Sequence, residues 1–309
     1  MPSPPPSVYE SCLAASERIR WRVEDFLGGD SRFDFTRPFL PESLARVEPL
    51  RFLSPVERLT LNHIRAHAYL GLLGLLEEFI LPFVLDHVRP RLGEDDVRAR
   101  AFLSFAGEEA KHIQLFRRCR EEFERGFGSP CDLVGPASAI AGAILGHDPL
   151  AVALTILHAE WMTQRHYVES VQDDRNLDLH FKSLLRHHWM EEAQHVRLDA
   201  TMVAALADEA SAVERAAAVE EYLDVVRLLD DTIGRQTDLD LQSFTRATDR
   251  ALEGDELDAF LEVQLQANRW TYLASGMTHP EFLASVAGLG DTLRERVEGV
   301  ARDFLLRPA

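Results

Sequence analysis

Two short Glu-x-x-His motifs, each preceded by a further glutamate, constrain the fold of this chain more than any other feature. The second motif is Glu192-Ala-Gln-His195, and His188 precedes its glutamate by one helical turn. At 3.6 residues per turn, these offsets place His188, Glu192 and His195 on one stripe of a single helix, with the two histidines about 20° apart around its axis. Two imidazoles and a carboxylate on one face favour the binding of iron, manganese or zinc. The first motif, Glu109-Ala-Lys-His112, repeats this chemistry upstream.

Two single glutamates lie at matching distances before the motifs. Glu77 precedes Glu109 by 32 residues, and Glu160 precedes Glu192 by 32 residues. Each half of this region is therefore predicted to be a helical hairpin that carries one lone glutamate and one Glu-x-x-His motif. Two such hairpins, packed as a four-helix bundle, bring four carboxylates and two motif histidines to one point, which is a ligand set of di-iron and di-manganese carboxylate proteins.

The first bundle helix has a clear start. Residues 54–57, Ser-Pro-Val-Glu, combine a serine cap, a proline at the first helical position and a glutamate three residues after the cap. We expect the helix to run to about Val88, with a kink near Pro82. Glu77 falls on its apolar face and Glu78 on a flank. Because an unpaired carboxylate among leucines costs free energy, Glu77 is the better ligand candidate. The outer face is expected to carry Arg65, Phe79 and Asp86.

The rest of the chain also predicts helices and no strands, so the expected fold class is all-α. Further helices are expected over residues 11–27, 95–123, 137–145, 149–172 and 178–207, and from 211 onward with breaks at Gly234, Gly254 and 276–280. We expect one structural domain in three parts. These are a tail, helix and proline-rich wrapping segment (1–55, with 1–8 disordered), the di-metal bundle (56–207) and a C-terminal helical extension packed on it (208–309).

Composition excludes several partners. The net charge of −18 and the lack of a basic cluster argue against nucleic acid. Three cysteines without paired spacing favour a reducing compartment, and the N-terminus does not resemble a signal peptide. The apolar run from Tyr69 to Leu85 is interrupted by Glu77 and Glu78, so no membrane span is expected. These features predict a cytoplasmic protein.

The ligand types favour iron, with manganese as the second choice. Four carboxylates balance the charge of two ferrous ions, and they can change between terminal and bridging coordination as the metals oxidise. Zinc would prefer four ligands with more nitrogen or sulfur. Dioxygen is the expected co-substrate of such a centre.

Over about residues 56–207 the chain resembles the ferritin-like di-iron superfamily. Rubrerythrins usually add a four-cysteine module that this chain cannot make, and the radical-generating ribonucleotide reductase subunits have a tyrosine where this chain has Phe116. Acyl-carrier-protein desaturases are similar around Glu77, Glu78 and Pro82 and have a threonine comparable to Thr163, but they lack a counterpart of His188.

His188 resembles the seventh ligand of the p-aminobenzoate N-oxygenase family. That resemblance implies a metal-ligand set of Glu77, Glu109, His112, Glu160, His188, Glu192 and His195. It also implies a centre that binds dioxygen as a peroxo species and oxidises a small organic molecule, with an amine nitrogen as one candidate target. An external electron donor, a small-molecule substrate and a homodimer are the expected partners. The alternative function is an iron-storage or oxygen- or peroxide-scavenging protein without an organic substrate.

Several side chains near these motifs have two interpretations. Thr163 is a candidate for passing protons to bound oxygen, or it packs against a helix carbonyl. His188 is a ligand or a buried structural histidine. His158, His166 and Tyr167 line a substrate pocket or are structural, and His63 and His67 are expected to be structural. Glu108 and Glu191 are expected to face away from the metals, available to nearby arginines.

Overall fold

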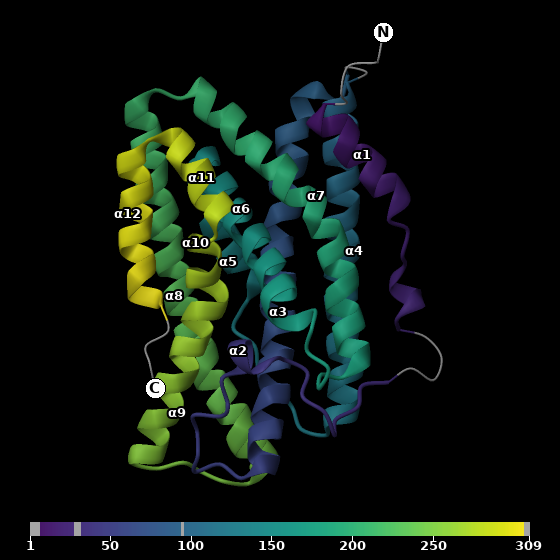
Figure 1. The fold of residues 1–309 in the computed structure, drawn as a ribbon, viewed down its shortest axis with the longest axis vertical. Helices are drawn as coiled ribbons and strands as arrows, with labels where there is room; N and C mark the ends of the chain where they lie inside the picture. The colour runs from purple at the N-terminus through teal and green to yellow at the C-terminus, as the bar shows by residue number, and fades with distance from the viewer. Residues whose placement is uncertain (1–6, 28–31, 94–95, 306–309) are drawn as a thin grey trace.

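The computed structural model describes residues 7–27, 32–93 and 96–305, and every regular element in those ranges is helical. The predicted all-α fold class is therefore confirmed (Figure 1). Of the expected disordered tail (1–8), residues 1–6 lie outside the described residues, and the prediction is wrong at Val8, which is helical.

Four helices form the central bundle. They are α3 (Pro55–Val88), α4 (Val97–Phe127), α6 (Pro149–His166) and α7 (Leu179–Glu209). The pairs α3 with α4 and α6 with α7 pack closely, as the two predicted hairpins require. The π-helical turn η3 (Tyr167–Val171) extends α6, and the short helices η2 (Arg89–Arg91) and α5 (Ala137–Leu145) lie in the connections.

The start of α3 is the one that its sequence predicts. The Ser54 side chain accepts a hydrogen bond from the Glu57 amide, the Glu57 side chain accepts one from the Ser54 amide, and Pro55 occupies the first turn. The helix continues without interruption through Pro82 to Val88.

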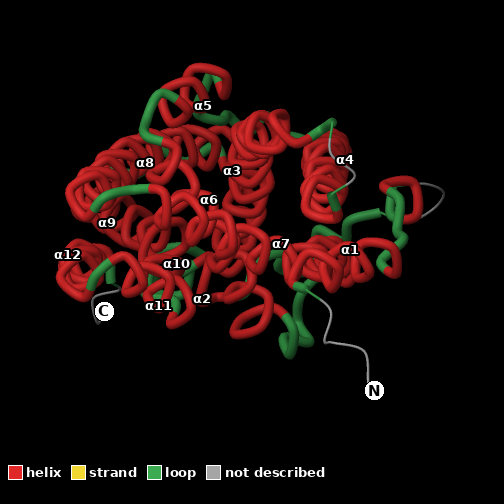
Figure 2. Tube along the Cα trace, turned by 90° about the horizontal axis from the view of Figure 1, so that it is seen from above, coloured by secondary structure: helices red, strands yellow, loops and turns green. Residues whose placement is uncertain are grey.

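The N-terminal segment crosses the outside of the bundle. Helix α1 (Val8–Arg18) packs on both α4 and α7, as Figure 2 shows from above, and η1 (Val23–Asp25) follows it. The helix predicted over 11–27 is thus shorter and starts earlier. The wrapping segment is largely irregular, with the short helix α2 (Glu42–Ala45) within it.

The C-terminal helices complete the core. Helix α8 (Ala212–Thr248) packs against α3 and α6, and α9 (Asp255–Arg269) packs against α8. The chain then forms η4 (Trp270–Ala274), α10 (Ser275–Met277), α11 (Pro280–Leu289), α12 (Asp291–Ala301) and η5 (Arg302–Phe304). The predicted break at Gly234 is wrong, because α8 runs through it; breaks do occur near Gly254 and before Pro280.

The packing of these helices shows that the predicted outer face of α3 is wrong at two of its three residues. Arg65 and Phe79, which were expected outside, are buried, whereas Asp86 is exposed. The Arg65 guanidinium donates to Asn268 of α9 and lies 3.4 Å from Asp240 of α8. A helix with apolar residues on most of its surface is buried on most of its surface.

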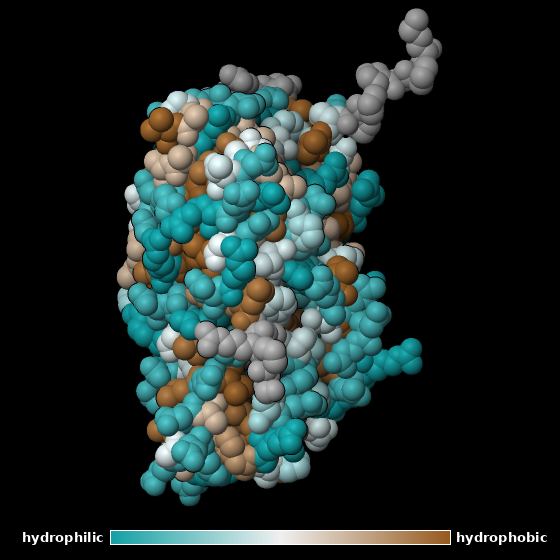
Figure 3. Space-filling view, turned by 60° about the vertical axis from the view of Figure 1, so that its left-hand side comes forward, coloured by the Kyte–Doolittle hydropathy of each residue, from teal (hydrophilic) through white to brown (hydrophobic). Residues whose placement is uncertain are grey.

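By length and composition, α3 could cross a membrane, but 56% of its most apolar 18-residue window is buried inside the structure. Figure 3 shows hydrophobic residues scattered among hydrophilic ones on one face of the molecule. These observations agree with α3 as a core helix.

Candidate metal centre

The seven candidate ligands all lie on the bundle helices and are buried. Glu77 comes from α3, Glu109 and His112 from α4, Glu160 from α6, and the other three from α7. None is more than 4% exposed. Helical spacing places the motif residues of α4 and of α7 on one face of each helix, because they follow one another by three or four positions.

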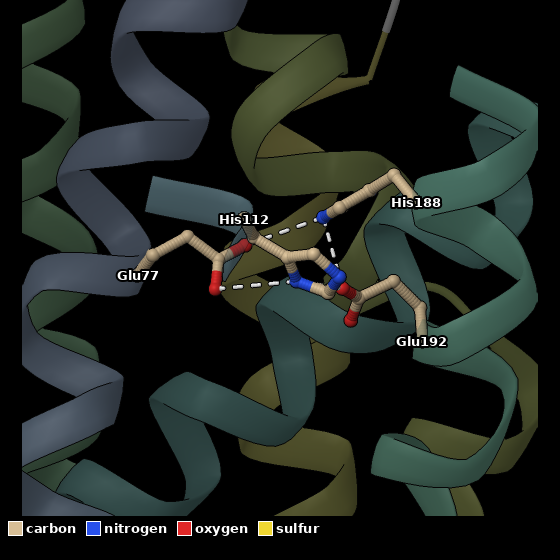
Figure 4. A group of neighbouring side chains, drawn as sticks. All are labelled: Glu77, His112, His188 and Glu192. Carbon is tan, nitrogen blue, oxygen red and sulfur yellow. Dashed lines mark hydrogen bonds and ion pairs between the residues drawn. The ribbon is translucent and has the colours of Figure 1, made fainter. Parts of the chain in front are cut away.

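Six of the seven form two overlapping clusters, each able to hold a metal ion. One cluster contains Glu77, His112, His188 and Glu192, and Figure 4 shows these side chains converging from three helices. The second cluster contains Glu109, His112, Glu192 and His195. In each cluster the ligand atoms lie within 4.8 Å of one another.

Two carboxylates connect the clusters. Glu192 Oε1 lies 3.0 Å from His112 Nδ1 and 2.9 Å from His188 Nε2, while its Oε2 lies 3.3 Å from His195 Nδ1. Glu109 Oε1 lies 2.8 Å from His195 Nδ1, and its Oε2 lies 4.0 Å from His112 Nδ1. Each carboxylate therefore directs one oxygen toward each motif histidine, as a bridging ligand between two metals would.

Of the two lone glutamates, Glu77 belongs to a cluster and Glu160 does not. Glu77 Oε1 is 3.3 Å from His188 Nε2, whereas its neighbour Glu78 is exposed, so the structure places only Glu77 at the site. Glu160 belongs to neither cluster but is buried beside Glu192. Burial, together with the charge of Glu192, raises the pKa of Glu160 well above its usual value.

Glu108 and Glu191 were expected to face away from the metals, and this prediction is wrong. Both are buried, and each holds the motif histidine of the other hairpin. Glu191 Oε2 lies 2.9 Å from His112 Nε2, and Glu108 Oε2 lies 2.8 Å from His195 Nε2. A carboxylate on the far nitrogen fixes the ring orientation and leaves Nδ1 as the nitrogen available to a metal.

The donor set fits two divalent cations. Oxygens of Glu77, Glu109, Glu160 and Glu192 are buried without a well-formed hydrogen bond. Such atoms are costly unless a cation or proton compensates them. Burial alone would lower the pKa values of His112 and His195, but their glutamate partners raise both well above the usual value. Metal binding at these nitrogens would displace protons.

The other predicted side chains are placed as follows. The Thr163 hydroxyl donates to the Glu160 carbonyl one turn back, 2.8 Å away, which agrees with its packing interpretation. His166 bonds Tyr69 and Ser275, and His158 bonds Tyr222. The contacts of His166 agree with its structural interpretation, whereas His158 also lines an apolar pocket. A proton-transfer role for Thr163 stays a prediction.

Asp199 was not among the sequence candidates. It follows Glu192 by seven residues, so it lies on the same helical stripe, and both of its oxygens are buried without a hydrogen bond. Burial and the nearby charges of Glu192 and Glu77 raise its pKa well above the usual value, against the opposing charge of His195. Its spacing from His195 was the signal that could have identified it.

An apolar pocket lies beside the bundle rather than at its axis. Its volume is about 30 Å³, and its lining includes Leu75 and Leu76 of α3, Ala159 of α6 and Leu229 of α8. Leu76 and Leu75 stand about 100° and 200° around α3 from Glu77, so the pocket lies off the face that carries Glu77. Leu229 in its lining places it against α8. It has room for about two water molecules.

Solved structures similar to this chain are R2-like ligand-binding oxidases. A tyrosine-to-phenylalanine variant with an anaerobically reconstituted Mn/Fe cofactor aligns with a TM-score of 0.43 and 13% identity, over 86% of this chain and 92% of that chain. A glycine-to-leucine variant with an aerobically reconstituted Fe/Fe cofactor gives 0.44 and 17%, over 86% and 93%. No family model and no curated protein matches. Likeness this distant assigns no activity, so the function is argued from the geometry of the site.

Proposed function

We propose that this protein is a non-haem di-iron oxygenase that uses dioxygen to oxidise a small organic molecule, with an amine nitrogen as one candidate target. The observation that carries the proposal is the pair of carboxylates, Glu109 and Glu192, that each reach toward both motif histidines in a fully buried site. Two irons, or manganese in place of iron, would supply the electrons that reduce dioxygen.

The protein's own residues would hold and isolate that chemistry. Glu108 and Glu191 orient the two motif imidazoles, and His188 adds a nitrogen next to Glu77. Phe105 packs on His195 with ring centroids 4.1 Å apart, and Phe116 packs on His188 at 4.9 Å. These rings exclude water from the nitrogen donors, which strengthens electrostatic interactions and limits side reactions.

The reaction would balance as a mono-oxygenation. One oxygen atom forms a bond to the substrate nitrogen and the other leaves as water, with two electrons from an external donor and two protons consumed. For substrate access we favour the pocket under α8, because Met162 and the partly exposed Leu229 line it and are side chains that can repack. We also keep the prediction of a homodimer, which light scattering would test.

The test is to mix anaerobic ferrous-loaded protein with dioxygen and follow absorbance and Mössbauer spectra. We expect two irons per chain and an absorbing transient that decays faster when an aryl amine is added, with an N-oxidised product recovered. Rapid conversion to a ferric product that consumes ferrous iron repeatedly, without effect of the amine, would instead indicate storage or scavenging. Failure to bind two irons would refute both functions.

A further inference from the structure

The two metal-binding motifs are identical except at one position. The first reads Glu-Glu-Ala-Lys-His (108–112) and the second Glu-Glu-Ala-Gln-His (191–195), so Lys111 of one occupies the place of Gln194 in the other. The motifs also pair across the bundle, since the first glutamate of each holds the histidine of the other. Within the two motifs, the halves of the centre therefore differ at this one position.

Lys111 and Gln194 make equivalent contacts. The Lys111 ammonium donates to Glu191, the carboxylate that holds His112. Gln194 Nε2 donates to Glu108 Oε2 at 2.7 Å, and Glu108 holds His195. One supporting carboxylate is thus paired with a cation and the other with a neutral amide.

The N-terminal segment extends both contacts outward. The Lys111 ammonium lies 3.9 Å from the centre of the Trp21 ring, which also stacks on His112 with centroids 6.0 Å apart. On the other side, Gln194 Nε2 donates to Ser16 Oγ at 3.0 Å. Trp21 holds the lysine by a cation–π contact, whereas Ser16 adds no charge to the glutamine side.

We propose that this single charge difference makes the two metal positions unequal, so that the first cation binds at the His195 position. The proposal rests on the two-metal site argued above. The Lys111–Glu191 pair is neutral as a unit, while Glu108 keeps its negative charge beside His195. In a buried site a full charge this close to an imidazole changes how strongly its other nitrogen binds a cation. His188, a neutral ligand near the His112 position, adds no opposing charge.

The test adds one equivalent of Mn²⁺ to the full chain and locates the ion in crystals by its anomalous scattering. Calorimetry then gives the stepwise binding constants of the first and second ions. In the unaltered protein we expect the ion at the His195 position, with a preference of about tenfold, the lower end of the effect of groups behind a metal ligand. Lys111→Gln, which makes the motifs identical, should remove most of that preference. The double variant Lys111→Gln/Gln194→Lys should move the first ion to the His112 position.

The outcomes separate the inference from the functional proposal. If Lys111→Gln leaves the ion at the His195 position with unchanged preference, the charge difference is not the cause and the inference fails, although two ions still bind. If the unaltered protein binds Mn²⁺ first at the His112 position, the inference has the wrong sign. If no variant binds two ions, the di-metal proposal itself fails. Circular dichroism and the unfolding midpoint establish that Lys111→Gln is folded, so it tests the inference even where Gln194→Lys does not fold.

Discussion

At the scale of single residues, Glu192 is the carboxylate that belongs to both clusters of candidate ligands and connects them. It lies within 3.3 Å of three imidazoles, and Glu78 offers a matched carboxylate that is exposed on α3. We expect Glu192→Gln to lower the metal content from two ions to fewer than one per chain, because the bridging charge is lost. Glu78→Gln should retain two. Elemental analysis after anaerobic loading measures both, and retention of two ions by Glu192→Gln would contradict a bridging role.

Two buried histidines that are not candidate metal ligands should make the fold less stable in acid. Burial lowers the pKa of His166 to about 3 and that of His158 to about 4. In the unfolded chain the pKa of each histidine is near 6.5, so below that pH the unfolded chain binds more protons than the folded one. The free energy of unfolding is therefore highest above pH 6.5 and falls as the pH decreases toward 4. At pH 5 each histidine should remove up to about 2 kcal/mol relative to pH 7. Urea unfolding of the metal-loaded protein checks this. Equal unfolding free energies at pH 7 and pH 5 would contradict it.

At the scale of elements, the features that depend on residues close together in the chain could be predicted from the sequence. The boundaries of α3 and α5 follow from caps, prolines and glycines within a few residues, and helical spacing alone aligned the ligands of α7. The buried position of Arg65 could not be predicted in this way, because it depends on α8 and α9, more than 150 residues later. The roles of Glu108 and Glu191 were missed for the same reason, since each acts on the other hairpin.

Helix α8 offers a test of capping on an element that covers the bundle. Ser211 Oγ accepts from the Glu214 amide, and the Glu214 side chain accepts from the Ser211 amide. Ser211→Ala should decrease the free energy of unfolding by about 1 kcal/mol, whereas Ser211→Gly, which leaves the cap exposed to water, should cost only a few tenths. Chemical denaturation of the metal-loaded protein distinguishes them. A loss close to zero for Ser211→Ala would show that the hydroxyl does not act as a cap.

At the scale of the whole molecule, the C-terminal helices are joined to the bundle by a buried polar network. Arg65 of α3 contacts Asp240 of α8, Asn268 of α9 and the Leu44 carbonyl in the wrapping segment. Gln236 Nε2 donates to Asp240 Oδ1 at 2.8 Å and to the Asp132 carbonyl at 3.1 Å. One network therefore connects all three predicted parts of the chain.

Removing one of the two charges, Arg65 or Asp240, should lower the free energy of unfolding more than removing both. Burial raises the pKa of Asp240 to about 6, and Arg65 opposes that rise, so the carboxylate is ionised at neutral pH because its partner is present. Arg65→Met should destabilise the fold by about 3–5 kcal/mol, since an uncompensated buried carboxylate is left. In Arg65→Met/Asp240→Leu that carboxylate is gone, so a large part of the loss should be recovered. Denaturation of both variants and of Asp240→Leu closes the double-mutant cycle. A double variant no more stable than Arg65→Met would mean that packing of the guanidinium, rather than its charge, holds α8 and α9 against α3.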